Sequence, residues 1–222
     1  GDEVITTPLT CSATNIPILY CGAKPVFADI QQKTLNIDPQ SVTSRITKRT
    51  KAIVIVDWAG LPCDMDEIME IGRRHKIPVI EDAAHAIGAI YKGKSIGSIS
   101  DATCFSFQAI KQITSGDGGI LTVKRKDWAK RAKLLRWYGI DRTFTGDIYK
   151  KFKVKEVGYK YHMHDLAATL ILAQIEDLKN ILARRREIAE RYRRELIGVS
   201  GLTLTAAPND RPQRVPQAGF IL

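Results

Sequence analysis

The fold is decided by two stretches, which read PVIEDAAH over residues 78–85 and FSFQAIK over residues 105–111. Each begins as a short apolar run, which predicts a buried strand. Asp82 places a carboxylate at the end of the first run, and Lys111 places an amine just past the second. The two groups stand about one βα unit apart. Ligands bind at the carboxyl ends of strands in open α/β sheets, so we expect both groups near a binding site.

Outward from these stretches, strand-like and helix-like segments alternate through most of the chain. Candidate strands lie at 4–7, 25–30, 52–58, 78–81, 102–107 and 119–123. Candidate helices lie at 12–20, 65–75 and 126–137, and another begins where Asp38 caps Pro39. The pattern predicts an α/β fold, with a mainly parallel sheet sandwiched between helices.

The pattern changes after Gly139. Residues 141–157 are polar and basic without a period, and one long helical pattern then runs from Leu166 to Leu196. We expect a large domain over residues 1–164, followed over 165–222 by a long connecting helix and the start of a small domain. Both ends interrupt a pattern, since residues 219–222 resemble a strand that has just begun, so the chain is expected to be part of a longer protein.

Composition narrows the classes of protein. The chain has 222 residues, of which 44% are hydrophobic and 26% are charged, as in globular proteins. It lacks both an apolar run of about 18 residues and a signal-peptide pattern, so a cytoplasmic location is expected. The net charge of +10 fits anionic ligands. Its basic cluster at 184–194 has an apolar helical stripe, which favours a solvated helix face over a nucleic-acid site.

The cysteines and histidines give no metal-binding pattern. Cys11, Cys21, Cys63 and Cys104 form no C-x-x-C pair and stand in apolar contexts, so we expect buried or half-buried free thiols. His162 and His164 form an H-x-H pair without supporting carboxylates. No metal is predicted.

Several chemistries remain open at Asp82 and Lys111 when each is taken alone. Asp82 could hold Mg²⁺, act as a base, pair with a protonated heterocycle, or cap a helix. Glu81 would point to the opposite side of the strand. Lys111 could extend to solvent, or could be a nucleophile with a pKa lowered by burial. Together they suggest pyridoxal phosphate, with Ser106 near its phosphate and His85 near its ring.

Motifs in order along nearly the whole chain carry a resemblance to one family. They read GDEVI at 1–5, GAKPVF at 22–27, EDAAHAIG at 81–88, FSF at 105–107 before Lys111, GDGG at 116–119 and RREIAERY at 185–192. Together they resemble the DegT/DnrJ/EryC1/StrS family, sugar aminotransferases of the aspartate aminotransferase fold that depend on pyridoxal 5′-phosphate.

The resemblance implies a role for each site residue. Lys111 would be the Schiff-base lysine, Asp82 the partner of the pyridinium nitrogen, Ser106 a phosphate contact and His85 a neighbour of the ring. It further implies a nucleotide-linked keto sugar as substrate, glutamate as amino donor, a place in polysaccharide biosynthesis, and a homodimer with shared active sites. Lys111 distinguishes the chain from related dehydratases, which carry His there.

Two positions depart from the family's pattern. Cys11 stands where the family usually places an aromatic residue that stacks on the cofactor ring. Lys160 stands where it usually places an Asn that reaches the phosphate in the neighbouring subunit. The resemblance also implies that the family's Gly-Thr/Ser phosphate loop and most of its small domain lie outside this sequence. A competing hypothesis is therefore a truncated, non-catalytic homologue that acts as a binding or regulatory protein.

Overall fold

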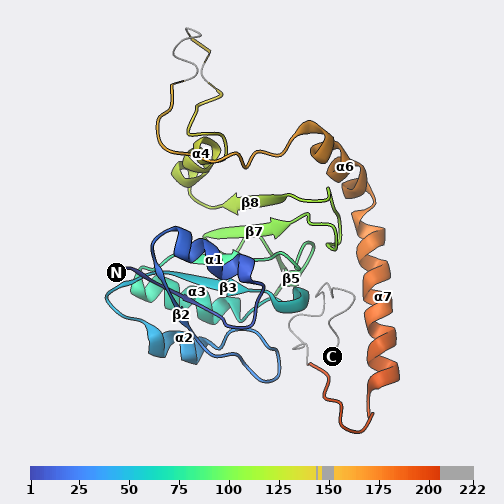
Figure 1. The fold of residues 1–222 in the computed structure, drawn as a ribbon. Coiled ribbons are helices and arrows are strands. Elements are labelled where there is room, and N and C mark those ends of the chain that lie inside the picture. The colour runs from blue at the N-terminus through green and yellow to red at the C-terminus, as the bar shows by residue number, and fades with distance from the viewer. Residues whose placement is uncertain (144, 147–152, 206–222) are drawn as a thin grey trace.

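A six-stranded sheet forms the centre of the computed structural model, which describes residues 1–143, 145–146 and 153–205 (Figure 1). The strand order is β2-β1-β3-β4-β7-β8, in which neighbours pair in parallel except that β8 is antiparallel to β7. The strands are β1 (Glu3–Thr6), β2 (Lys24–Phe27), β3 (Thr50–Val56), β4 (Val79–Asp82), β7 (Ala102–Ser106) and β8 (Gly119–Val123). A small hairpin of β5 (Ile90–Tyr91) and β6 (Lys94–Ser95) lies beside the sheet. The predicted α/β class with a mainly parallel sheet is confirmed.

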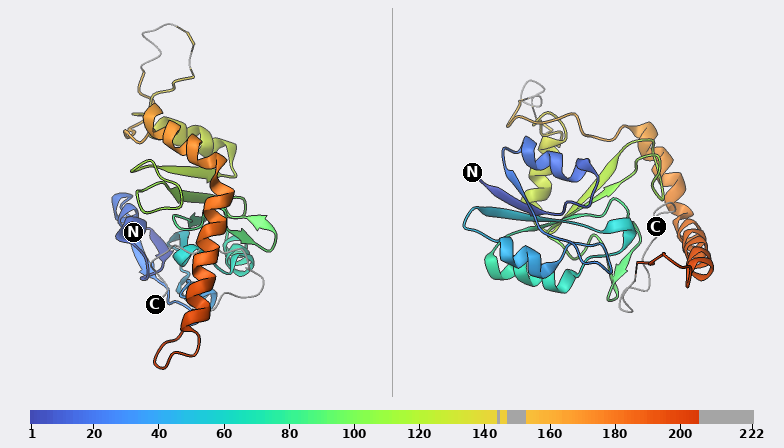
Figure 2. Two further views of the ribbon diagram at one scale, coloured as in Figure 1. Left: turned by 90° about the vertical axis from the view of Figure 1, so that its right-hand side faces the viewer. Right: turned by 60° about the horizontal axis from the view of Figure 1, so that its bottom comes forward.

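Helices cover both faces of the sheet. In Figures 1 and 2, α1 and α4 lie over one face, and α2 and α3 lie over the other. Helices α6 and α7 run down one side of the sheet. The bounds are α1 (Ser12–Tyr20), α2 (Pro39–Arg45), the short 3₁₀ helix η1 (Trp58–Gly60), α3 (Met65–His75), α4 (Lys126–Leu135), α6 (Asp165–Glu176) and α7 (Leu178–Leu196).

Alternation along the central strands builds a core on each face. Side chains of successive strand residues point to opposite faces, so a strand covered on both sides must be apolar throughout. One core joins Ile53 and Ile55 of β3 to the residues of α2 and α3, and the other joins Val54 to Ile18 of α1. Asp82 therefore lies on the α1 face, and Glu81 lies on the α2–α3 face.

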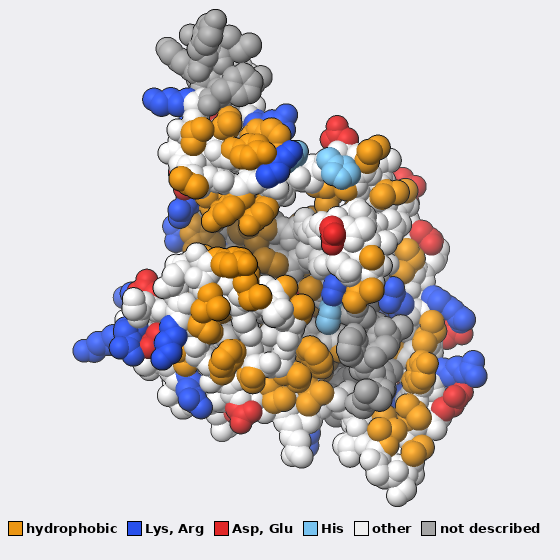
Figure 3. Space-filling view, viewed as in Figure 1, with side chains coloured by type: hydrophobic (Ala, Val, Ile, Leu, Met, Phe, Trp, Pro, Cys, Tyr) orange, Lys and Arg blue, Asp and Glu red, His pale blue; other side chains and the backbone are white. Residues whose placement is uncertain are grey.

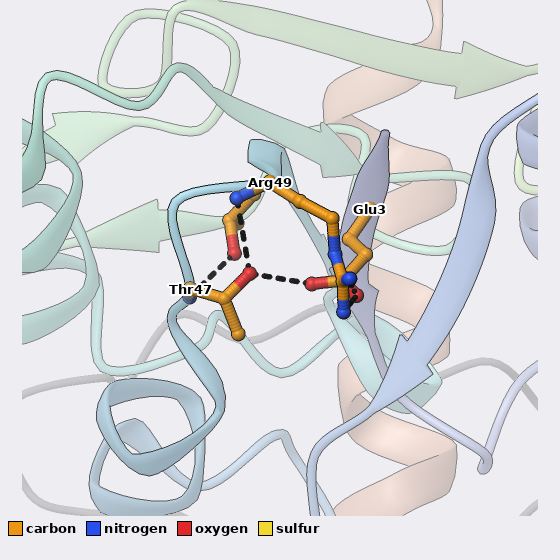
Figure 4. A network of polar contacts seen from close by, with 4 residues as sticks. Glu3, Thr47 and Arg49 are labelled. Carbon is orange, nitrogen blue, oxygen red and sulfur yellow. Dashed lines mark hydrogen bonds and ion pairs between the residues drawn. The ribbon is translucent and has the colours of Figure 1, made fainter. Parts of the chain in front are cut away.

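The start of β1 is fixed by a polar network at the edge opposite the site (Figure 4). Glu3 is only 4% exposed, and its carboxylate accepts hydrogen bonds from the Thr47 hydroxyl at 2.6 Å and from Arg49 Nε at 2.9 Å. The Thr47 hydrogen bond, followed by that from Arg49, lowers the pKa of Glu3 below its ordinary value. The network ties the loop before β3 to the start of β1.

The expected single helix over residues 166–196 is wrong. Two helices, α6 and α7, meet at Asp177, whose φ of −97° and ψ of 5° interrupt the helical path. The two helices share one cluster, against which Leu178 and Ile181 of α7 also pack, but only α7 extends into the main core. Ile171 of α6 packs with Phe107 and Ile113, whereas Leu182 of α7 joins the main core.

The thiols are free, as expected, but only Cys63 is buried. Cys11 and Cys21 flank α1 at its two ends, and Cys104 lies near the carboxyl end of β7, so all three are exposed. No described helix is long and apolar enough to cross a membrane. The strand expected at 219–222 lies outside the described residues, as does most of the expected small domain and part of the segment 141–157.

Candidate functional site

Asp82 ends β4 with its carboxylate held by two donors. The Thr14 hydroxyl donates to Oδ2 at 2.6 Å, and the Ala84 N–H donates to Oδ1 at 3.1 Å. Thr14 lies 2.7 Å from the Thr10 hydroxyl, so a short chain of hydroxyl groups leads from the start of α1 to the carboxylate. Half-buried Asp82 thus presents a carboxylate of fixed orientation at the carboxyl edge of the sheet.

Lys111 lies in the turn after β7, at the same edge of the sheet. Its side chain is half-buried, and burial lowers the pKa of its amine, while the charges of Asp82 and Cys11 oppose the shift. The backbone around it is held from outside the sheet: Arg185 of α7 donates to the Lys111 carbonyl at 3.2 Å. Gln174 of α6 bonds both the N–H and the carbonyl of Thr114. The amine is therefore carried on a supported turn.

His85 lies close to both groups. Burial lowers the pKa of its imidazole to about 4, with the Lys111 charge adding to the shift and the Asp82 charge opposing it. The imidazole is therefore neutral at neutral pH. Gln112 donates to the His85 carbonyl at 2.6 Å, and the Trp58 ring lies 6.2 Å from the imidazole, centroid to centroid. These contacts hold His85 between the lysine turn and the Trp58 loop.

Cys11 and Ser106 border the same edge. Cys11 is the N-cap residue of α1, with no side-chain capping bond, and its thiol is exposed near enough to Lys111 to affect its pKa. Half-buried Ser106 ends β7 and accepts a hydrogen bond from the Gln108 N–H at 3.2 Å. The structure therefore brings five of the six predicted residues to one edge of the sheet.

Lys160 belongs to another part of the surface. It is exposed, it forms a β-bridge with Trp137, and its amine lies 5.0 Å from the centre of the Trp137 indole. His162 packs edge-on against the same indole, with 4.0 Å between ring centroids. The predicted contact of Lys160 with a phosphate in a neighbouring subunit stays a prediction.

The other interpretations of Asp82 fit less well. The residues after it form turns and no helix, so the Ala84 N–H bond to its carboxylate is a turn contact and no helix cap. Glu81, the nearest other carboxylate in sequence, is buried on the opposite face. Within the described part of the chain, no group of three or more metal-ligating side chains assembles.

Sequence reasoning missed Thr14, Trp58 and Cys104. Thr14 and Ile18 are the buried positions of α1, so a polar residue in a buried stripe was the signal that could have found it. Cys104 pairs in register with Asp82, and although solvent reaches its side chain, desolvation by the surrounding protein raises the pKa of its thiol to about 11. For Trp58, the sequence offers no signal.

Fold and site together define an α/β protein with an acid and an amine of lowered pKa at the carboxyl edge of its sheet. Residues 1–221 match the model of the DegT/DnrJ/EryC1/StrS aminotransferase family, and the chain belongs to that family. The predicted resemblance is confirmed.

Three relatives illustrate the match. The spore coat polysaccharide biosynthesis protein SpsC of Bacillus subtilis is 44% identical over 208 residues, which are 91% of this chain and 53% of SpsC. The crystal structure of AtS13 from Actinomadura melliaura is 42% identical, with a TM-score of 0.88 over 95% of this chain and 58% of AtS13. The sugar aminotransferase CalS13 from Micromonospora echinospora is 35% identical, with a TM-score of 0.89 over the same shares. The chain thus spans little more than half the length of these relatives.

Proposed function

We propose that this chain is the cofactor-binding part of a sugar aminotransferase that uses pyridoxal 5′-phosphate. The amino group would pass from glutamate to a keto sugar carried on a nucleoside diphosphate. One observation carries the proposal: Asp82, oriented by Thr14, and Lys111, with its lowered pKa, lie at one edge of the sheet close enough for their charges to interact.

The residues present fit this cofactor by their chemistry. The Asp82 carboxylate would face the ring nitrogen, and the Lys111 amine would hold the aldehyde carbon. Ser106 offers a hydroxyl at the end of β7 for the phosphate, and His85 offers a neutral imidazole beside the ring.

Each side chain has a defined task. When bound, pyridoxal phosphate supplies an electron sink for the electrons left on an amino acid that loses its α-proton. Once the amino group of the donor has displaced it from the aldehyde, Lys111 would take up that proton and return it to the cofactor, because a lowered pKa increases the fraction of neutral amine that can act as a base. Asp82 keeps the ring nitrogen protonated through its negative charge. His85 contributes hydrogen bonding without a second positive charge near Lys111.

Two departures from the family's pattern shape the proposed site. Cys11 offers a small thiol where an aromatic ring would stack, so packing of the cofactor ring would depend more on His85, whose imidazole lies beside the Trp58 ring. Lys160 offers a cation in place of an amide, and a cation suits a phosphate in a partner subunit.

The substrate and the partner are inferred from charge and surface. A net charge of +10 suits anionic nucleotide sugars, and the name of SpsC connects that relative with polysaccharide biosynthesis.

Apolar side chains are exposed on the face seen in Figure 3. Exposed apolar side chains on α1 and α6 are those that a homodimer would bury: Ile16, Leu19, Tyr20, Leu166, Leu170 and Leu172. Light scattering on the full-length protein should give a dimer, and a monomer would contradict this part.

An absorbance titration of the full-length protein with pyridoxal phosphate tests the core of the proposal. A bound-cofactor band that disappears in Lys111→Ala, followed by amination of one member of a panel of nucleotide keto sugars, is expected. Lys76→Ala is the control, because Lys76 lies on the surface beyond α3, away from the site edge. The absence of a band in the wild-type protein would instead favour the non-catalytic homologue, for which Cys11 is the supporting observation.

A further inference from the structure

Two carboxyl groups, Asp57 and Glu81, lie fully buried beneath the site, each with 0% exposure. Glu81 lies in β4 opposite Ile55 of β3, and Asp57 follows β3 on the same face. Glu81 Oε2 lies 2.8 Å from Ser100 Oγ and accepts a hydrogen bond from Thr103 Oγ1 at 2.9 Å. The Cys63 N–H donates to Asp57 Oδ1 at 3.0 Å.

One oxygen of each carboxyl group remains to be considered. Asp57 Oδ2 and Glu81 Oε1 are buried, and no donor group of the described residues meets hydrogen-bond geometry with them. The Glu81 carboxyl group lies close enough to Asp57 to raise its pKa, so a hydrogen bond between these two oxygens would satisfy both. Two carboxylate oxygens cannot form that bond without a proton between them, and two adjacent buried negative charges would be very costly.

The surroundings place the proton on Asp57. Burial raises the pKa of Glu81, but the hydroxyl donors Ser100 and Thr103 oppose that shift and favour its ionised form. Burial, followed by the charge of Glu81, raises the pKa of Asp57 well above its ordinary value of 3.8. The other groups that act on the pair are the Cys63 thiol, the Gly97 backbone and the Cys104 thiol of β7.

The pair is connected to both halves of the site. The Asp57 N–H donates to the Asp82 carbonyl at 3.0 Å, and Glu81 directly precedes Asp82. The Cys63 contact to Asp57 closes the loop that carries Trp58, whose ring lies beside His85. A change in the charge or geometry of the pair would therefore move the Asp82 backbone and the Trp58 loop together.

We propose that Asp57 and Glu81 share a single proton and act as positioning residues, which fix the backbone of Asp82 and the loop that carries Trp58. The positioning role rests on the proposed function, in which Asp82 faces the cofactor. The shared proton itself does not depend on it, and so it can be measured without cofactor.

Two variants of Asp57 separate the roles of shape and hydrogen bonding. Asp57→Asn keeps the size and donates an N–H to Glu81, so it imitates the protonated acid. Asp57→Leu has a similar size but offers no donor. In the full-length protein, pyridoxal phosphate should bind Asp57→Asn within about threefold of wild type and Asp57→Leu about tenfold or more weakly. Equal weakening in both variants would overturn the positioning role.

Infrared spectroscopy of the cofactor-free protein tests the shared proton directly. At neutral pH the wild-type protein should show the stretch of a buried protonated carboxyl group, and Asp57→Asn should lack it. If the wild-type band is absent, or persists in Asp57→Asn, the shared proton on Asp57 is refuted. The infrared measurement tests the shared proton even if Asp57→Leu fails to fold.

The pH dependence of unfolding gives a further readout. Because the pKa of Asp57 is raised in the folded state, the stability that its protonation contributes is fully present below the unfolded-state pKa and is lost as pH rises through the folded-state value. The melting temperature of wild type relative to Asp57→Asn should therefore fall with rising pH, and a constant difference would count against the proposal. Failure of the proposed function would look different: wild type would bind no cofactor, while the infrared band remained.

Discussion

The Thr14 hydroxyl donates a 2.6 Å hydrogen bond to Oδ2 of Asp82, and so joins α1 to the end of β4 across 68 positions of sequence. Thr14 is buried at 8% exposure, so water cannot easily replace the donor. We expect Thr14→Val, which keeps the shape of the side chain, to weaken the binding of pyridoxal phosphate by about tenfold, the typical effect of a lost hydrogen bond to a charged group. A fluorescence titration measures the dissociation constant.

Thr14→Ser is the matched control, since it keeps the hydroxyl and loses only a methyl group. Its dissociation constant should stay close to that of wild type. If Thr14→Val bound the cofactor as tightly as Thr14→Ser, the hydroxyl would have no part in orienting Asp82.

The low pKa of His85 predicts a pH-dependent stability. The folded-state pKa of about 4 lies below the ordinary value of 6.5, so the unfolded chain binds more protons between these values. The free energy of unfolding that neutral His85 contributes is therefore fully present above pH 6.5 and is lost as pH falls toward 4. Partial exposure limits its size to about 1–2 kcal/mol.

Urea unfolding at neutral and at mildly acidic pH measures this contribution. His85→Gln cannot titrate, so its free energy of unfolding should fall less than that of wild type as the solution is acidified. Equal losses in the two proteins would show that His85 is not held neutral by burial.

The sheet could be predicted because its signals are local. Runs such as residues 52–56 and 78–80 are apolar. The Asp38–Pro39 signal marked the start of α2, where Asp38 accepts hydrogen bonds from the N–H groups of Gln40 and Ser41. The break at Asp177 could not be predicted in this way. The break lies where the contacts change, since Ile171 of α6 packs with Phe107 and Ile113 whereas Leu182 of α7 also reaches the main core, and the helical period of the sequence continues through it.

The site residues that could be predicted are those whose positions are set by the end of a strand. Asp82, Ser106 and Lys111 stand at or just after strand ends, so topology alone brings them to one edge. Thr14 and Trp58 enter from α1 and from the loop after β3, and their approach to Asp82 and His85 depends on how those elements pack. Asp57 and Glu81 are a similar case, because their contact requires the register of β3 against β4.

Gly88 and Gly93 allow a matched test of how α7 docks on the sheet. Both have positive φ, +76° and +79°, which strains any substituted residue. A Cβ on Gly88 would lie 2.3 Å from Leu182 Cδ1, whereas a Cβ on Gly93 meets no atom within 4 Å. Gly93→Ala should cost about 1 kcal/mol of unfolding free energy, and Gly88→Ala about 1–3 kcal/mol more. Urea unfolding compares them, and equal costs would mean that α7 yields freely at Leu182.

The charge of Asp82 acts on Lys111, and this interaction can be measured in the cofactor-free protein. Burial lowers the pKa of Lys111, and the Asp82 charge opposes the shift, so neutralising Asp82 should lower that pKa further. Labelling with an amine-selective reagent over a pH series, with mass spectrometry of the peptide that contains Lys111, gives the midpoint of its reactivity.

We expect the wild-type midpoint to lie below the ordinary lysine value of 10.5 and the Asp82→Asn midpoint to lie lower still. Asp117→Asn is the control, because Asp117 is exposed in the glycine-rich turn before β8, and it should leave the midpoint unchanged. A rise in Asp82→Asn, or no change, would mean that the two groups do not interact across the edge of the sheet. The acid and the amine would then be unable to hold opposite ends of one cofactor ring, and the proposed aminotransferase chemistry would lose its structural basis.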